Sequence, residues 1–359
     1  MTIQSVLLAG GYGVVGAEVA RLIRQNYPEI NILLGGRSPG SGDDLAKQLG
    51  NAITVHVDST DEDPLADLKK LPDVVLAVVN DPNDQLLLSS VRRGIPYIDV
   101  TRWTERLRRA IQRVKDAEDV RAPVVFSSSW MAGVAATLAA GYARTFSSIE
   151  QIDIGILYAT KDRAGPNSVE YMDRIHLPFE VFDGGEPTMV KPFQKAHRTN
   201  FPQTGSFNLY RFDTPDQFTL PRVTGARGVA ARIGFDDSLS GALLSALVRL
   251  GIWKMISGDA FRGLRHGMLF NPGEGAPHRI RIDIDGITER GVQEQHSWLI
   301  TDPESQTHMT ALGALIQFDR LVNSQESVEN GVQIAEEVTH LDHCLTMLKA
   351  NSVEVSKIT

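Results

Sequence analysis

The residues best suited to chemistry form a glycine-rich stretch near the start of the chain. It reads Leu7-Leu8-Ala9-Gly10-Gly11-Tyr12-Gly13-Val14-Val15-Gly16. Gly11 permits a tight turn, Gly13 lets a pyrophosphate approach the backbone, and Gly16 lets the next helix pack closely on the sheet. The free N–H groups at a helix N-terminus then attract phosphate oxygens. We therefore expect residues 10–16 to bind a dinucleotide, with a glycine-rich turn that binds no ligand as the alternative.

Arg37 and Ser38 indicate which dinucleotide binds. They follow the apolar run Ile30–Leu34 and two glycines, and no Asp or Glu occurs between Ile30 and Gly42. An acid near this position usually binds the ribose 2′-hydroxyl of NAD, whereas an arginine accommodates the 2′-phosphate of NADP. The guanidinium of Arg37 and the hydroxyl of Ser38 suit a phosphate. The expected cofactor is NADP(H), and a solvated loop cation at Arg37 is the alternative.

Further candidates lie at the ends of later apolar runs, because ligands of parallel sheets bind at the carboxyl ends of the strands. The remaining expected cofactor contacts are Asp58, Ser59, Val79, Asn80 and Thr101. The expected substrate contacts are Asp99, Arg102, Trp130 and Met131, with Trp130 as a wall of the substrate cleft. A turn or helix-capping role is the alternative at each position. The sequence identifies no catalytic acid–base pair.

The elements that must position these residues alternate along the first 130 residues. The apolar runs, typical of strands buried on both faces, are Ser5–Ala9, Ile30–Leu34, Ile53–Val57, Val74–Val79, Tyr97–Val100 and Val124–Phe126. The helical patterns between them cover residues 15–23, a short helix opened by Pro64, Gln85–Arg93 and Glu105–Val120. This alternation predicts an α/β fold, with a Rossmann-type doubly wound parallel sheet over residues 1–132.

The pattern changes after Gly133 and predicts a second, α+β domain over residues 133–322. Its expected elements are a helix over Ala132–Phe146, a strand over Ile152–Tyr158, a loop-rich tract from Thr160 to Gly228, paired strands over His278–Ile284 and Gln293–Ile300, and a helix over Thr307–Val322. In the first of the paired strands, three isoleucines share one face and charged residues share the other, as in a half-exposed antiparallel strand. A last helix is expected over Thr339–Ala350.

The apolar segment Leu239–Ile256 is too polar to cross a membrane, because it contains Ser240, Ser245, Arg249 and Lys254. We expect a buried or dimer-forming helix, and a membrane-surface helix is the alternative. If the substrate carries carboxylates, arginines of the second domain should bind them. The candidates are Arg163, Arg174, Arg198 and Arg211.

Composition limits the class of protein. The chain has 359 residues, 42% of them hydrophobic, and a formal net charge of −8 from 36 basic and 44 acidic residues. Such a chain can bury a large core, and it lacks the basic footprint of a nucleic-acid binder. Its single cysteine, Cys344, allows no internal disulfide, and no signal peptide is recognisable, so a cytoplasmic location is expected. His340 and His343 are expected on a helix surface, and no metal site is expected.

Several motifs together resemble the saccharopine dehydrogenase-like NADP-dependent reductases. They are the glycine-rich stretch, Gly-Gly-Arg-Ser at 35–38, Gly94-Ile95-Pro96-Tyr97-Ile98-Asp99 and Val125-Phe126-Ser127-Ser128-Ser129 with Gly133 beyond, and more loosely Leu209–Asp213 and Leu220-Pro221-Arg222. The resemblance implies an NADP-binding Rossmann domain and a second domain for substrate and dimerisation. It also implies that the C-terminal segment 323–359 packs back on the first domain. Trp130-Met131-Ala132-Gly133 lacks the proline that many members have there, which implies a different substrate.

The expected function is an NADPH-dependent oxidoreductase that reduces a C=N (imine) bond of an amino-acid-derived or secondary metabolite. Hydride chemistry belongs to the cofactor, and a protonated imine accepts hydride without a strong general acid. One alternative is reduction of an activated C=C or C=O in an apolar, lipid-like substrate. Another is a non-catalytic NADP-sensing protein. The expected partners are a small-molecule substrate and a second copy in a homodimer, with no nucleic acid and no transmembrane span.

Overall fold

The computed structural model describes residues 3–162, 171, 173–261, 263, 265, 275–323 and 328–358. The chain divides into two compact units, Met1–Gly133 with Thr310–Thr339, and Val134–Met309 with His340–Thr359. The segment 323–359, expected to pack on the first domain as a whole, is thus divided at Thr339 between the two units.

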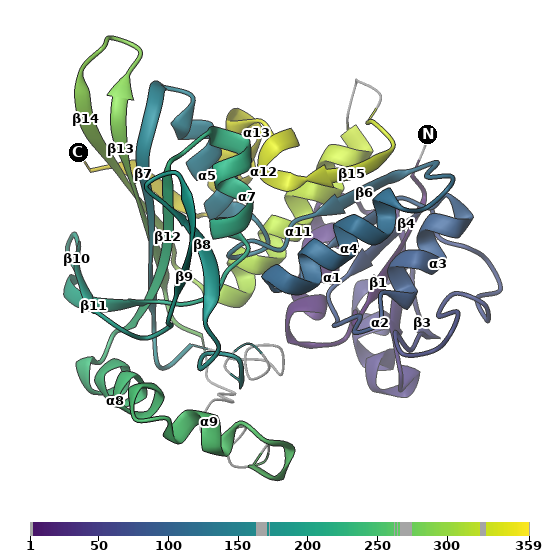
Figure 1. The fold of residues 1–359 in the computed structure, drawn as a ribbon. Helices are drawn as coiled ribbons and strands as arrows, with labels where there is room; N and C mark the ends of the chain where they lie inside the picture. The colour runs from purple at the N-terminus through teal and green to yellow at the C-terminus, as the bar shows by residue number, and fades with distance from the viewer. Residues whose placement is uncertain are drawn as a thin grey trace. The chain divides into compact units, whose positions relative to one another are not determined.

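The first unit is built on a parallel sheet in the strand order β15-β6-β5-β4-β1-β2-β3 (Figure 1). Its strands are β1 (Ser5–Ala9), β2 (Asn31–Gly36), β3 (Ala52–His56), β4 (Val74–Ala77), β5 (Tyr97–Asp99), β6 (Pro123–Phe126) and β15 (Gly331–Ile334). The first six confirm the predicted strands and follow the doubly wound order 3-2-1-4-5-6. The seventh comes from near the end of the chain and pairs in parallel with β6.

Helices of the first unit connect these strands. They are α1 (Val14–Asn26), the 3-10 helix η1 (Pro39–Gly42), α2 (Asp43–Leu49), α3 (Gln85–Arg93), α4 (Thr104–Lys115), the later part of α11 (Gln306–Asn323) and α12 (Ala335–Val338). The helix expected at Pro64 is wrong, because residues 64–67 form a turn with isolated bonds such as Ala66 N–H to Asp63 O. Helix α2 escaped prediction, because it buries only Ala46 and has no apolar stripe.

The second unit is built on a mixed sheet in the order β10-β11-β12-β7-β13-β14-β16. Its strands are β7 (Phe146–Tyr158), β10 (His197–Phe201), β11 (Gly205–Arg211), β12 (Gly228–Phe235), β13 (His278–Thr288), β14 (Gln293–Asp302) and β16 (Glu354–Lys357). The prediction of a loop-rich tract from Thr160 to Gly228 is wrong over the described residues of that range. It contains β10, β11, the hairpin β8 (Phe179–Asp183) to β9 (Glu186–Val190) and helix α7 (Asp216–Thr224), whose short lengths leave little periodicity in the sequence.

The alternating strands are confirmed. Ile280, Ile282 and Ile284 are fully buried, and Ile282 lies opposite Ile154 of β7 and Trp298 of β14. Helices α5 (Val134–Ala143) and α13 (Leu341–Ala350) pack against each other closely enough that a Cβ on Gly141 would lie 2.7 Å from the Leu341 Cβ. This packing and the pairing of β16 with β14 explain why residues 340–359 belong to the second unit.

The segment Leu239–Ile256 forms two helices, α8 (Ser238–Arg249) and α9 (Ile252–Ile256), followed by the 3-10 helix η2 (Asp259–Phe261). Gly251 interrupts the expected single helix with a φ of +76°. The segment was expected to be buried or to form a dimer; one face is not buried in the single chain, because Leu239, Leu243 and Leu250 are exposed. Across the described ranges, every helix is too short or too polar to cross a lipid bilayer.

Candidate functional site

The glycine-rich turn is shaped by close backbone contacts that only glycine permits. A Cβ on Gly16 would lie 2.1 Å from the Gly10 carbonyl oxygen, and one on Gly11 would lie 2.8 Å from the Leu8 carbonyl oxygen. Gly10 has a φ of +87°, in the region that favours glycine. The Gly10 and Gly11 N–H groups both donate to the Gly35 carbonyl, at 2.8 and 3.1 Å, which fixes the turn to the end of β2.

Gly13 is less crowded than Gly11 and Gly16. It is exposed, and a Cβ there would meet only the Gly10 oxygen, at 3.2 Å. Gly13 is the N-cap of α1 and offers no side chain to the first N–H groups of the helix, and Val14 beside it is also exposed. The turn therefore presents an open helix N-terminus, which suits a phosphate group.

Tyr12 lies across the end of β2. A Cβ on Gly36 would lie 2.2 Å from the Tyr12 hydroxyl oxygen, and one on Gly42 would lie 2.7 Å from its ring. The hydroxyl accepts a hydrogen bond from the Ser38 N–H at 2.9 Å. Gly36 and Gly42 thus form a cradle for the tyrosine ring, and the ring holds the backbone beside Arg37. The sequence singled out Tyr12 as part of the turn but gave no sign of this cradle.

Arg37 and Ser38 are both exposed at the end of β2. Arg37 makes no hydrogen bond or ion pair with any described residue, so its guanidinium is available to an anion. Its charge still reaches Asp58: hydrogen bonding from the Thr60 N–H chiefly holds the pKa of this carboxyl below its ordinary value, and Arg37 contributes. An arginine that no described residue pairs with, beside a backbone held in place by Tyr12, fits a 2′-phosphate.

The other predicted cofactor residues lie at the ends of β3, β4 and β5. Ser59 Oγ donates to the Asn80 carbonyl at 2.7 Å, which joins the loops after β3 and β4. Thr101 Oγ1 lies 3.4 Å from the Val79 carbonyl oxygen. Val79 in turn lies beside the glycine-rich turn, since a Cβ on Gly10 would be 3.0 Å from the Val79 Cβ. The structure thus brings these residues together along one edge of the sheet.

Asp99 and Arg102 are fully buried and pair with each other, so neither side chain is open to a substrate. Arg102 Nε donates to Asp99 Oδ2 at 2.8 Å, its Nη1 donates to Asp84, and its Nη2 lies 3.6 Å from Asp81 Oδ2. Asp99 Oδ2 also accepts from the Tyr97 hydroxyl at 2.9 Å. We call Asp81, Asp84, Asp99 and Arg102 the buried ion cluster, and we exclude its members from the substrate site proposed below.

The turn after β6 is held in an unusual backbone conformation. Met131, Ala132 and Gly133 have successive φ values of +54°, +51° and +85°, and a positive φ is costly for the first two. Ser127 Oγ donates to the Ala132 carbonyl at 2.6 Å. A Cβ on Gly313 of α11 would lie 2.5 Å from the carbonyl oxygens of both Met131 and Ala132. Gly313 therefore lets α11 pack directly on this turn, a role that the sequence reasoning missed.

Trp130 stands next to this turn and is half-buried. The preceding Ser129 is fixed, because its Oγ donates to Glu336 Oε1 at 2.9 Å. Met131 Sδ lies 3.3 Å from Thr310 Oγ1 of α11. The residues on either side of Trp130 are thus held in place, and Trp130 itself is partly exposed.

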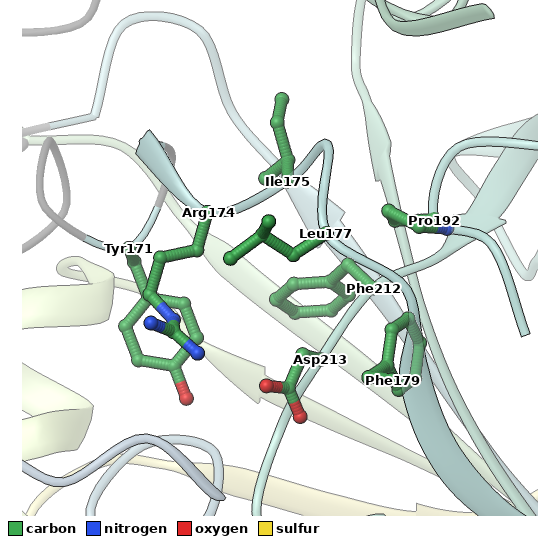
Figure 2. A pocket seen from close by; sticks show the side chains of 8 residues that line it. All are labelled: Tyr171, Arg174, Ile175, Leu177, Phe179, Pro192, Phe212 and Asp213. Carbon is green, nitrogen blue, oxygen red and sulfur yellow. The ribbon is translucent and has the colours of Figure 1, made fainter. Parts of the chain in front are cut away.

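The second unit contains a small hollow with apolar walls and a polar end (Figure 2). Its lining residues are Tyr171, Arg174, Ile175, Leu177, Phe179, Pro192, Phe212 and Asp213. Among the predicted carboxylate-binding arginines, Arg174 lines this hollow and Arg198 is exposed on β10. Arg211 has a buried Nη1 without a hydrogen-bond partner among the described residues, and Arg163 lies outside them. Within the described residues, no cluster of His, Cys, Asp or Glu side chains could hold a metal ion.

Comparison with solved structures identifies the fold. Apo saccharopine dehydrogenase (L-Glu forming) from Saccharomyces cerevisiae is similar over 99% of this chain and 100% of that chain, with a TM-score of 0.73 and 14% sequence identity. The chain has the saccharopine dehydrogenase fold. The resemblance read from the sequence is thereby confirmed at the level of the fold.

Two further solved structures are similar to the chain with lower TM-scores. A meso-dapdh mutant from Clostridium tetani has a TM-score of 0.48 and 12% identity over 97% of this chain and 99% of that chain. An oxidoreductase from Thermotoga maritima has a TM-score of 0.43 and 13% identity over 97% of this chain and 95% of that chain. Neither a family model nor a curated protein matches the sequence.

Proposed function

We propose that the chain is an NADPH-dependent oxidoreductase that reduces the C=N bond of an amino-acid-derived or secondary metabolite. The observation that carries the proposal is Arg37, an exposed guanidinium at the end of β2 that has no partner among the described residues. Together with the open N-terminus of α1, it matches the two anionic parts of NADPH, the pyrophosphate and the 2′-phosphate. The saccharopine dehydrogenase fold supports the same assignment.

Each predicted cofactor residue of the first unit has a proposed role. The turn Gly10–Gly16 binds the pyrophosphate, and Arg37 and Ser38 bind the 2′-phosphate. Asp58 and Ser59 border the adenine side, whereas Val79, Asn80 and Thr101 border the nicotinamide side. When bound, NADPH would supply the hydride; the protein supplies binding and orientation.

The proposed substrate contacts are Trp130 and Met131, and the buried ion cluster supports the neighbouring loops. The turn around Met131 is held by Ser127 and by the close approach of Gly313, so it forms a rigid edge of the site. A protonated imine carries its own positive charge and needs no strong acid to accept hydride. The reaction therefore does not need Asp99 or Arg102 as a proton donor. These two residues form a buried ion pair with each other.

Cofactor titration with turnover tests the proposal. NADPH should bind at least about tenfold more tightly than NADH, as expected for one charge-assisted contact. NADPH oxidation should then depend on an added imine, for which simple cyclic imines serve as probes. Equal affinity for both cofactors would contradict the NADPH assignment. Tight NADPH binding without oxidation by imines, ketones or activated alkenes would favour an NADP sensor instead.

The oligomeric state is a separate prediction. The family resemblance predicts a homodimer, and sedimentation should then give twice the chain mass of 39.4 kDa. A strict monomer at micromolar concentration would contradict it.

A further inference from the structure

Helices α8 and α9 present an apolar face to solvent. It consists of Leu239, Ala242, Leu243, Ala246, Leu250 and Met255, and we call it the α8–α9 face. The exposed fractions are 75% for Leu239, 55% for Leu243, 73% for Leu250 and 77% for Met255. The α8 members recur at spacings of three and four residues, so they share one side of the helix. Contiguous exposed apolar surface of this kind marks an interaction site.

The opposite side of the two helices is firmly packed in the second unit. Leu244 and Ser245 are buried, and Ser245 Oγ donates to the Phe193 carbonyl at 2.8 Å. Trp253 of α9 is completely buried. The Asp237 carboxylate caps α8 by accepting from the Leu239 and Ser240 N–H groups, at 3.0 and 2.7 Å. The two helices are therefore packed on one side, and the α8–α9 face is their exposed side.

The end of α9 is also held. The buried Arg265 donates to the Gly258 carbonyl at 2.8 Å and to the Ile256 carbonyl, and it pairs with Asp173. A buried guanidinium bonded to two carbonyls fixes the chain that leaves the helix. The two helices thus form a rigid platform with one apolar side turned outward.

Charge indicates what covers this platform. Within the two helices, residues 238–256, the charged side chains are Arg249 and Lys254, and the acidic residues Asp236, Asp237 and Asp259 lie beyond the helix ends. Both cations are exposed, and Arg249 adjoins Leu250 at the border of the apolar face. In a two-fold dimer through this face, each copy would bring the same two cations to the interface, and like charges repel. An anionic surface complements the segment, whereas a second copy does not.

We propose that the α8–α9 face docks on an anionic membrane surface. The leucines and Met255 enter the boundary between headgroups and acyl chains, while Arg249 and Lys254 reach the lipid phosphates. The contact lies in the plane of the interface, because α8 has 12 residues and a spanning helix needs about 20. This proposal is independent of the cofactor assignment.

Vesicle flotation of the full-length protein tests the proposal. The protein should bind vesicles of phosphatidylcholine mixed with phosphatidylglycerol, and bind much more weakly to phosphatidylcholine alone. Met255→Glu should weaken binding at least about tenfold, because a charge replaces a side chain that enters the lipid. Arg249→Gln and Lys254→Gln should each weaken binding about fivefold at low salt and lose their effect at high salt.

Met189→Glu is the matched control. Met189 is 65% exposed on β9, outside the α8–α9 face, and its replacement should leave vesicle binding unchanged. All variants change exposed residues and should keep the wild-type melting temperature. Failure of the wild-type protein to bind either vesicle would overturn the proposal. So would a lipid-free dimer that Met255→Glu dissociates, since a second copy would then cover the face.

Discussion

Arginines follow two regions of the parallel sheet, at the end of β2 and after β5, and their surroundings are opposite. At the end of β2, Arg37 is exposed and has no partner among the described residues. At the ends of β4 and β5, Arg102 is completely buried and surrounded by Asp81, Asp84 and Asp99. An arginine at a strand end is therefore a ligand-binding candidate only where the protein leaves its charge unpaired.

The buried ion cluster connects two loops of the first unit to helix α4. One fully buried arginine faces three carboxylates, and Asp84 Oδ2 also receives Arg109 Nε at 2.8 Å and Arg113 Nε at 3.2 Å from α4. These contacts connect the loops after β4 and β5 to α4. The cluster thereby stabilises the loops that carry Asn80 and Thr101, while the open end at Arg37 remains available to a ligand.

The largest effect is expected from breaking the cluster. Arg102→Met leaves the carboxylates buried without their central cation, so the free energy of unfolding should fall by about 3–5 kcal/mol. Chemical denaturation measures the loss. Arg21→Met is the control, because Arg21 forms an exposed pair with Glu18 and should cost less than about 1 kcal/mol. Similar losses in both variants would contradict the structural role of Arg102.

Gly16 of the glycine-rich turn should not tolerate a methyl group, whereas Gly40 of the 3-10 helix η1 should. Gly16→Ala places a Cβ 2.1 Å from the Gly10 carbonyl oxygen, so the turn must distort. Overpacking of this kind costs about 1–3 kcal/mol of stability, and NADPH binding should be lost with it. Gly40→Ala is the control, since nothing lies within 4 Å of a Cβ there. Fluorescence titration with NADPH and thermal melting compare the two, and unimpaired binding by Gly16→Ala would disprove the role of the turn.

Replacing Trp130 tests whether this residue contacts the substrate or the cofactor. Trp130→Ala should lower turnover about tenfold, a loss of about 1.4 kcal/mol, while NADPH affinity stays within about threefold. Steady-state kinetics with an imine substrate and a separate cofactor titration provide the two readings. If cofactor affinity falls instead, Trp130 belongs to the cofactor site.

The smallest expected effect is a pH dependence within the cluster. Burial raises the pKa of Asp81 above its ordinary value of 3.8, although the Leu87 N–H and Arg102 oppose the shift. The folded state then holds this proton to a higher pH than the unfolded state does. Stability should therefore fall as pH rises from the ordinary pKa through the raised one. Asp81→Asn should remove this decline and change stability near neutral pH by less than about 1 kcal/mol; denaturation across this pH range tests it.

Much of the fold was predictable because its signals are local. Buried parallel strands are continuous apolar runs, and six of them appeared where the sequence placed them. The glycine-rich turn is largely local, since the close contacts of Gly11, Gly13 and Gly16 lie within residues 8–16 or at the neighbouring end of β2. Strand β15 was missed because its pairing with β6 joins segments about 200 residues apart.

Features of the candidate site that depend on distant partners were not predictable. The sequence shows Tyr12 but not that Gly36 and Gly42 make room for its ring. It shows Asp99 and Arg102 as polar residues at a strand end but not that Asp81 and Asp84 also face the buried guanidinium of Arg102. Residues that could bind a ligand can be recognised in one sequence. The side chains that pair with them become known only from the fold.

The most direct test of the account is the effect of Arg37→Ala on the two cofactors. Only NADPH carries the 2′-phosphate, so the variant should bind NADPH about 10- to 150-fold more weakly, as expected for the loss of 1.5–3 kcal/mol. Its affinity for NADH should stay unchanged. Arg21→Ala, on the exposed surface of α1, should alter neither affinity. Equal losses for both cofactors, or no loss for NADPH, would contradict the assignment of Arg37 as the residue that selects NADPH.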